Sequence, residues 1–152
     1  MKTTFLDYLW VAGVGGLAGA AAMYFVVRIL NSLGWVKGDI LLAIGDIFLH
    51  RREGALGLGI LLHLLTSVAF APLYLLILSK LGFGTLPAAA VAGGFFGFFH
   101  GVFVSLALVW VASNKDMLPE FHGGRLPLGV MHCIGHIAYG ITVGCVIASV
   151  LQ

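Results

Sequence analysis

The chain has 152 residues, of which 61% are hydrophobic and 9% are charged, and its formal net charge is +2 at pH 7. Charged residues make up about a quarter of an ordinary soluble domain. This composition and the mean hydropathy of +1.09 therefore exclude a soluble protein and indicate an integral membrane protein. The few basic residues form no clustered face of the kind that binds nucleic acid, which excludes nucleic acid as a partner.

The whole chain is predicted to form one all-α transmembrane domain, a four-helix bundle, because a helix needs about 20 residues to cross the hydrocarbon. The first apolar run, residues 5–33, is too long for a signal peptide and predicts a retained first helix. Residues 39–50 are too few to span and predict an interfacial amphipathic helix before the second span. Asp39 is placed to cap its start, and the spacing of Asp46 and His50 favours an interfacial hydrogen-bonded pair.

The remaining spans are predicted at residues 57–78, 88–111 and 126–151, and Pro72 should kink the second span in its latter half. Basic residues are unevenly divided between the two ends of this bundle. The end with the interfacial helix has Arg28, Lys37, Arg51, Arg52, Lys115 and Arg125, whereas the other end has Lys2 and Lys80. Because cytoplasmic flanks are rich in Lys and Arg, both termini are predicted to lie outside the cytoplasm, with the protein in the cytoplasmic (inner) membrane.

Four histidines lie inside the predicted spans, namely His63, His100, His132 and His136. An ionisable side chain at membrane depth is costly and indicates a functional site by default. The topology places three of them roughly 8 to 14 Å deep and His100 roughly 17 Å deep, all measured from the cytoplasmic side. Each also shares a helical face with glycines, and such a face should contact protein. The four histidines are therefore predicted to share one site.

Imidazole is a common ligand of haem iron, zinc and copper, and a bis-histidine haem needs one histidine from each of two facing helices. The candidate axial pairs are His63 with His136 and His100 with His132. The alternative is a mononuclear metal site, in which His132 and His136 share one helix face and His100 or His63 completes the coordination. The expected cofactor is therefore a haem b or a transition metal such as copper or zinc, with all four histidines as candidate ligands.

Three classes of function follow from these residues, and the favoured one is a haem- or metal-binding membrane subunit that passes electrons between a quinone pool and a larger complex. The second is a proton or metal-ion transporter, which the lack of a deep carboxylate in the last three spans disfavours. The third is a structural or assembly subunit whose histidines only hydrogen-bond between helices. A lipid or quinone headgroup held by hydrogen bonds is a further alternative.

No catalytic constellation is present, so a non-catalytic subunit is predicted, surrounded by membrane lipids and associated with other membrane subunits or with copies of itself. Four strings run through most of the chain: H-I-A-Y-G-I-T-V-G at 136–144, G-D-I-L-L-A-I-G-D-I-F at 38–48, G-I-L-L-H-L-L-T at 59–66 and G-F-F-H-G at 97–101. With them the chain resembles a family of small prokaryotic four-span membrane proteins that have a final-helix H-x-x-Y-G-x-x-x-G motif. The resemblance implies the four-helix fold with a surface helix and no particular chemistry, and His132 is not part of its pattern.

Overall fold

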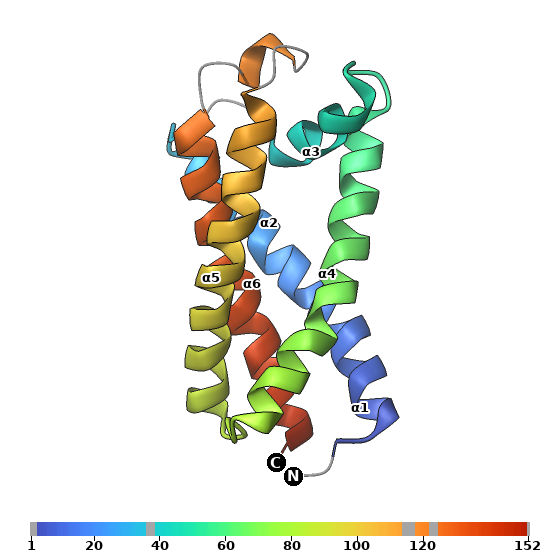
Figure 1. Cartoon of the computed structure of the whole chain (residues 1–152), viewed down its shortest axis with the longest axis vertical. Helices are drawn as coiled ribbons and strands as arrows, with labels where there is room; N and C mark the ends of the chain where they lie inside the picture. Colours follow the sequence, from blue (N-terminus) through green and yellow to red (C-terminus); the bar gives the residue numbers. More distant parts are fainter. Residues whose placement is uncertain (1–2, 36–38, 114–117, 122–124, 152) are drawn as a thin grey trace.

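The computed structural model describes residues 3–35, 39–113, 118–121 and 125–151, and within them every regular element is a helix (Figure 1). Four stretches are long and apolar enough to cross a bilayer, so the protein is a multi-pass membrane protein. They are Phe5–Ser32, Ala55–Lys80, Leu86–Val111 and Leu126–Leu151. The predicted all-α four-helix fold is confirmed, and the limits of the spans differ from the predicted ones by at most two residues. The first and last described residues lie at the same end of the bundle (Figure 1).

The first span differs from the single regular helix that the sequence predicts. It begins as α1 (Phe5–Trp10), continues as the π-helix η1 (Val11–Gly15) and ends as α2 (Gly16–Ser32). A capping box caps the start of α1. Thr4 Oγ1 accepts a hydrogen bond from the backbone N–H of Asp7, and the Asp7 carboxylate accepts one from the backbone N–H of Thr4. The wider π turn contacts α4 and α6, and hydropathy gives no signal for such a turn.

The interfacial helix is α3 (Ile40–Leu49), which lies across the end of the bundle opposite the termini (Figure 1). Its predicted cap is confirmed, since Asp39 Oδ1 accepts from the backbone N–H groups of Leu41 at 2.8 Å and Leu42 at 3.3 Å. Two glycines let α3 cross α4 (Ala55–Lys80) with backbone against backbone. A Cβ added to Gly45 would meet the carbonyl oxygen of Ala55, and one added to Gly59 would meet that of Leu41.

The predicted pair of Asp46 and His50 is wrong. Asp46 is fully buried, whereas His50 ends α3 in a left-handed conformation with its side chain exposed. Asp46 Oδ2 instead accepts a hydrogen bond from the backbone N–H of Leu118 at 2.7 Å, and its Oδ1 has no partner within the described residues. The short η2 turn (Pro119–Phe121) is held against α3 and α4 because Phe121 is buried there.

Glycines bring α5 (Leu86–Ala112) and α6 (Arg125–Leu151) into backbone contact. A Cβ on Gly93 would meet the carbonyl oxygen of Gly140, and a Cβ on Gly140 would meet that of Gly93. One turn along, a Cβ on Gly97 would meet the carbonyl oxygen of His136. This close approach is what small residues spaced by four allow in lipid, and it confirms that the glycine-rich faces contact protein. It also sets the depth and rotation of His136 relative to α5.

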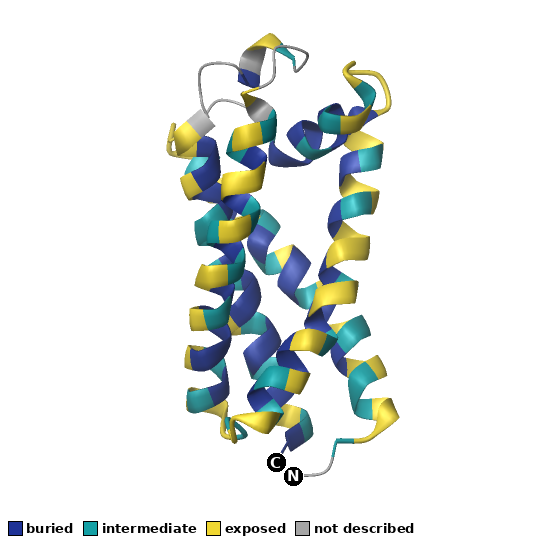
Figure 2. Ribbon diagram, viewed as in Figure 1, coloured by how far each residue is buried: buried dark blue, intermediate teal, exposed yellow. Residues whose placement is uncertain are grey.

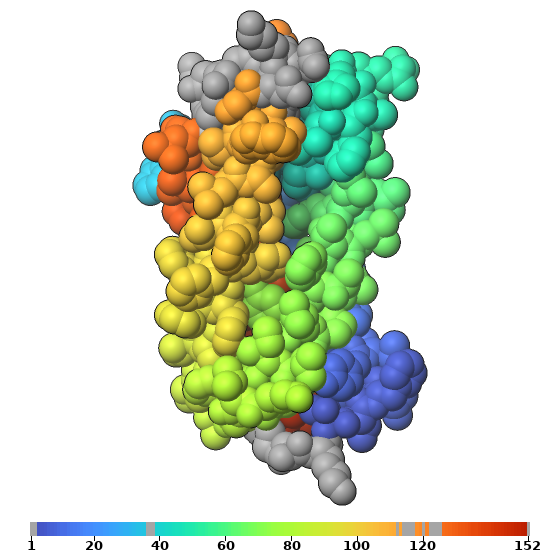
Figure 3. Space-filling view, in the orientation of Figure 1, coloured from blue at the N-terminus to red at the C-terminus, as the bar shows by residue number. Residues whose placement is uncertain are grey.

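The second span, α4, packs much less closely against α5 than α6 does. Its latter part leans across towards α5 and α6 (Figure 1), and this helix contains Pro72. Buried residues follow the inward faces of the helices, whereas the outer faces of α4 and α5 are exposed (Figure 2). Between the first half of α4 and the facing part of α5, just below α3, the molecular surface is hollowed (Figure 3).

Candidate functional site

The hollow leads into a cavity of about 310 Å³ between α4 and the α5–α6 pair. Met23 of α2 lines this cavity, and Ile44, Ile47 and Phe48 of α3 line it at the end of the bundle opposite the termini. All four histidines of the predicted site line it as well, so the expected gathering of the four residues is observed. Their function as cofactor or metal ligands stays a prediction.

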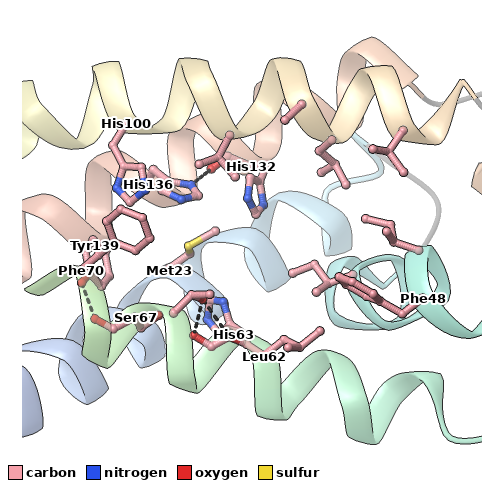
Figure 4. Close-up of a pocket in the computed structure, with 17 residues that line it drawn as sticks. Met23, Phe48, Leu62, His63, Ser67, Phe70, His100, His132, His136 and Tyr139 are labelled. Carbon is pink, nitrogen blue, oxygen red and sulfur yellow. Dashed lines mark hydrogen bonds between the residues drawn. The ribbon is translucent and has the colours of Figure 1, made fainter.

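The four histidines are divided between two walls (Figure 4). His100 of α5 and His136 and His132 of α6 form a row on one wall, and His63 of α4 lies on the other. The ring centroids of His100 and His136 are 4.7 Å apart, and those of His132 and His136 are 4.5 Å apart. His136 therefore lies between its two neighbours. Of the two candidate axial pairs, only His63 with His136 has its members on facing walls.

Backbone hydrogen bonds fix the orientation of His136 and His63. His136 Nδ1 donates to the carbonyl oxygen of His132 at 3.0 Å, and His63 Nε2 donates to the carbonyl oxygen of Ala20 at 3.3 Å. A neutral imidazole has one N–H and one lone pair, so His136 keeps its lone pair on Nε2 and His63 keeps its own on Nδ1. Metal-binding histidines commonly donate their second ring nitrogen in this way.

His100 has the surroundings of a residue that joins helices. Its Nδ1 shares a hydrogen bond of 3.2 Å with the hydroxyl of Tyr74, and its ring stacks on Phe70 with 4.6 Å between the centroids. The neighbouring Tyr139 donates to the carbonyl oxygen of Ser67 at 2.6 Å. The bond to Tyr74 therefore supports, for His100, the alternative in which a histidine only hydrogen-bonds between helices.

His132 has the opposite surroundings. Its side chain is only 4% exposed, and its Nδ1 is buried without a hydrogen-bond partner among the described residues. Leaving a buried polar atom unpaired costs about 1–3 kcal/mol, so native proteins rarely do it without a reason such as a bound ion. Among the four histidines of the cavity, His132 is thus the one with a buried ring nitrogen that has no hydrogen-bond partner within the described residues.

Met23 of α2 is a cavity residue that the sequence reasoning missed. Its side chain is buried, and its sulfur lies between the two walls (Figure 4). A methionine in an apolar helix is most often a packing residue, so Met23 by itself gives no signal. The sequence feature that could have indicated such a residue is Gly135. It lies between His132 and His136 and leaves room for a side chain from a facing helix. A Cβ on Gly135 would meet Met23 Cγ at 2.9 Å.

The positions of the His, Cys, Asp and Glu side chains limit which kinds of metal site the protein can form. Within the described residues no three His, Cys, Asp or Glu side chains are grouped to hold one metal ion. The mononuclear site predicted from His132, His136 and a third histidine is therefore not preformed there. The residues that line the cavity include no carboxylate.

Comparisons of the chain with protein-family models, curated proteins and solved structures gave no significant match. The resemblance to a family of small four-span proteins therefore stays a prediction. The function has to be inferred from the residues that line the cavity.

Proposed function

We propose that the protein is a small membrane subunit that binds a redox-active metal centre, a haem b or a transition-metal ion, through its intramembrane histidines. In this role it passes electrons within a larger membrane complex. The observation that carries the proposal is the hydrogen bond from His136 Nδ1 to the carbonyl oxygen of His132. It leaves the Nε2 lone pair of His136 available at a largely apolar cavity, and an apolar, restricted surrounding is one of the features that tune a metal centre.

A haem b would be bound by His63 and His136, because these two histidines lie on facing walls. Ligand pockets have volumes of about 300–1,000 Å³, and the cavity of about 310 Å³ lies at the lower end of that range. A whole macrocycle therefore requires α4 to move away from α5. A single ion fits without that movement.

The position of the cavity supports an electron partner that is dissolved in the bilayer. The hollow between α4 and α5 faces the side of the bundle and not its ends (Figure 3). A quinone could approach from the lipid by this route and exchange electrons with the centre, while neighbouring membrane subunits or a second copy of the chain would receive them. Proton or metal-ion transport has less support, because conduction paths usually recruit carboxylates and none lines the cavity.

The spectrum and metal content of the purified protein test this proposal. We expect protein purified in native lipid to carry either a Soret band or a bound transition metal, and we expect His136→Ala to lower its occupancy by roughly 10-fold or more. His50→Asn is the control, because His50 is exposed outside the spans and asparagine tolerates its positive φ of 50°. Equal occupancy in both variants would contradict the assignment of His136. Protein with neither chromophore nor metal would contradict the proposed function.

Orientation can be tested separately. Because basic residues are more numerous at the α3 end and cytoplasmic flanks are rich in Lys and Arg, we propose that this end faces the cytoplasm and that both termini lie outside it. Alkaline phosphatase, which is active only outside the cytoplasm, should therefore be active when fused after Gln152. A fusion of a reporter that works only in the cytoplasm should be inactive, and the reverse pattern would invert the topology.

The second candidate function is a structural one, and the hydrogen bond between His100 and Tyr74 favours it. In that case the histidines join helices and the cavity is only a packing gap. Tyr74→Phe and His100→Phe would then lower stability while no variant changes cofactor content. The occupancy measurement on His136→Ala separates the two functions.

A further inference from the structure

We infer that the cavity is a site for a single cuprous ion, bound by the thioether of Met23 together with the imidazoles of His132 and His136. The inference rests on the proposed function and names its metal. A thioether is a soft ligand that selects Cu(I), and imidazole also suits copper. Harder ions such as Zn²⁺ prefer four ligands drawn from Cys, His and carboxylates, and such a group is not found among the described residues.

The first supporting observation is the position of the Met23 sulfur. A Cβ on Gly135 would lie 2.9 Å from Met23 Cγ and 3.4 Å from Met23 Cε. The sulfur is bonded to both of these carbons, so it also lies against α6 at Gly135. His132 precedes Gly135 by three residues, and His136 follows it directly. The side chains of Met23, His132 and His136 all line the same cavity. The packing of α2 on α6 therefore brings one sulfur beside two imidazoles.

The second observation is independent of Met23 and concerns the nitrogen donors. His136 has its lone pair on Nε2 because Nδ1 donates to a backbone carbonyl. His132 is 4% exposed, and its Nδ1 has no partner within the described residues. An ion bound at His132 Nδ1 would give this buried nitrogen the partner that it lacks. Two imidazoles and one thioether are enough for Cu(I), which accepts fewer ligands than Zn²⁺.

Charge also favours a monovalent ion. Met23, His132 and His136 are neutral ligands, and no carboxylate lines the cavity. The bound ion therefore keeps its full charge at membrane depth. Because the cost of placing an ion in a low-dielectric medium rises with the square of its charge, Cu(I) is far less costly there than Cu(II) or Zn(II).

The test compares Met23→Leu with Met131→Leu in the full chain, purified in detergent and kept anaerobic. Both methionines are buried, and Met131 adjoins His132 in sequence but does not line the cavity. Cu(I) buffered by a bicinchoninate chelator is the probe, and Zn(II) is titrated in parallel. We expect one Cu(I) per chain in the wild type. Met23→Leu should bind it about 10-fold or more weakly, and Met131→Leu should bind it as the wild type does.

X-ray absorption at the copper edge supplies a second readout that a packing effect would not change. The wild type and Met131→Leu should show one sulfur and two nitrogen scatterers, whereas Met23→Leu should lose the sulfur. A nitrogen-only shell in the wild type, or Zn(II) bound as tightly as Cu(I), would overturn the inference and leave the proposed function standing. A Soret band without uptake of Cu(I) would do the same. Protein that binds neither haem nor metal would overturn both.

Discussion

Gly93→Ala should destabilise the bundle by roughly 1–3 kcal/mol, the cost of inserting a methyl group into a closely packed contact. The added Cβ would meet the carbonyl oxygen of Gly140. Because that atom belongs to the backbone of α6, it cannot rotate aside as a side chain can, and the two helices have to separate. The free energy of unfolding, measured by titrating the purified protein with sodium dodecyl sulfate in mixed micelles, checks this prediction.

The neighbouring glycine provides the comparison. The nearest atoms to a Cβ on Gly94 would be side-chain atoms of Ile141 and Ile137, the closest at 2.8 Å, so Gly94→Ala should cost less. Gly140→Ala should resemble Gly93→Ala, because its Cβ would meet the carbonyl oxygen of Gly93. If Gly93→Ala and Gly94→Ala have equal stabilities, the backbone contact between α5 and α6 does not hold the bundle together.

Gly59→Ala should release α3 from α4, with a loss of roughly 1–3 kcal/mol. A Cβ at this position would meet the carbonyl oxygen of Leu41, so α3 cannot remain seated across α4. Because Ile44, Ile47 and Phe48 of α3 line the cavity, the same substitution should also open it at the α3 end. Faster hydrogen exchange of the backbone amides of α3 is the expected measurement.

The matched control is Gly57→Ala, two residues earlier in the same helix. A Cβ on Gly57 would have no atom within 4 Å, and alanine has the higher helix propensity of the two residues. Gly57→Ala should therefore leave α3 exchange unchanged. Equal exchange of α3 in Gly59→Ala and Gly57→Ala would show that the crossing of α3 over α4 tolerates a side chain.

Hydropathy and helical periodicity were sufficient to predict the fold of this chain. Runs of about 20 apolar residues define the spans because lipid offers no partner for an unpaired backbone group. The spacing of Gly93, Gly97, Gly140 and Gly144 predicted that these faces contact protein, since glycines four residues apart lie on one face. Asp39 predicted the start of α3 through the local chemistry of capping.

The candidate site was predictable only in part. Depth and helical face predicted that the four histidines would gather, because both follow from residue numbers once the topology is known. The order of the rings, with His136 between His100 and His132, depends on how the helices are rotated against one another. The participation of Met23 depends on which helix crosses α6 at Gly135, and the bond between Asp46 and Leu118 joins residues far apart in the chain. The bond between Asp46 and Leu118 has no local sequence signal, and Gly135 indicates only that a side chain from a facing helix fits there.

The π-helical turn at Val11–Gly15 has a consequence for how the first span can change its length. A residue removed from a regular α-helix rotates everything on one side of the deletion by about 100°, which turns a packed face towards lipid. A π turn holds one residue more than an α turn needs, so losing that residue restores regular helix and leaves both flanking faces where they were. Gly13 lies within this turn, and a Cβ added to it would have no atom within 4 Å. The first span thus contains a position where a one-residue deletion is absorbed by the helix itself.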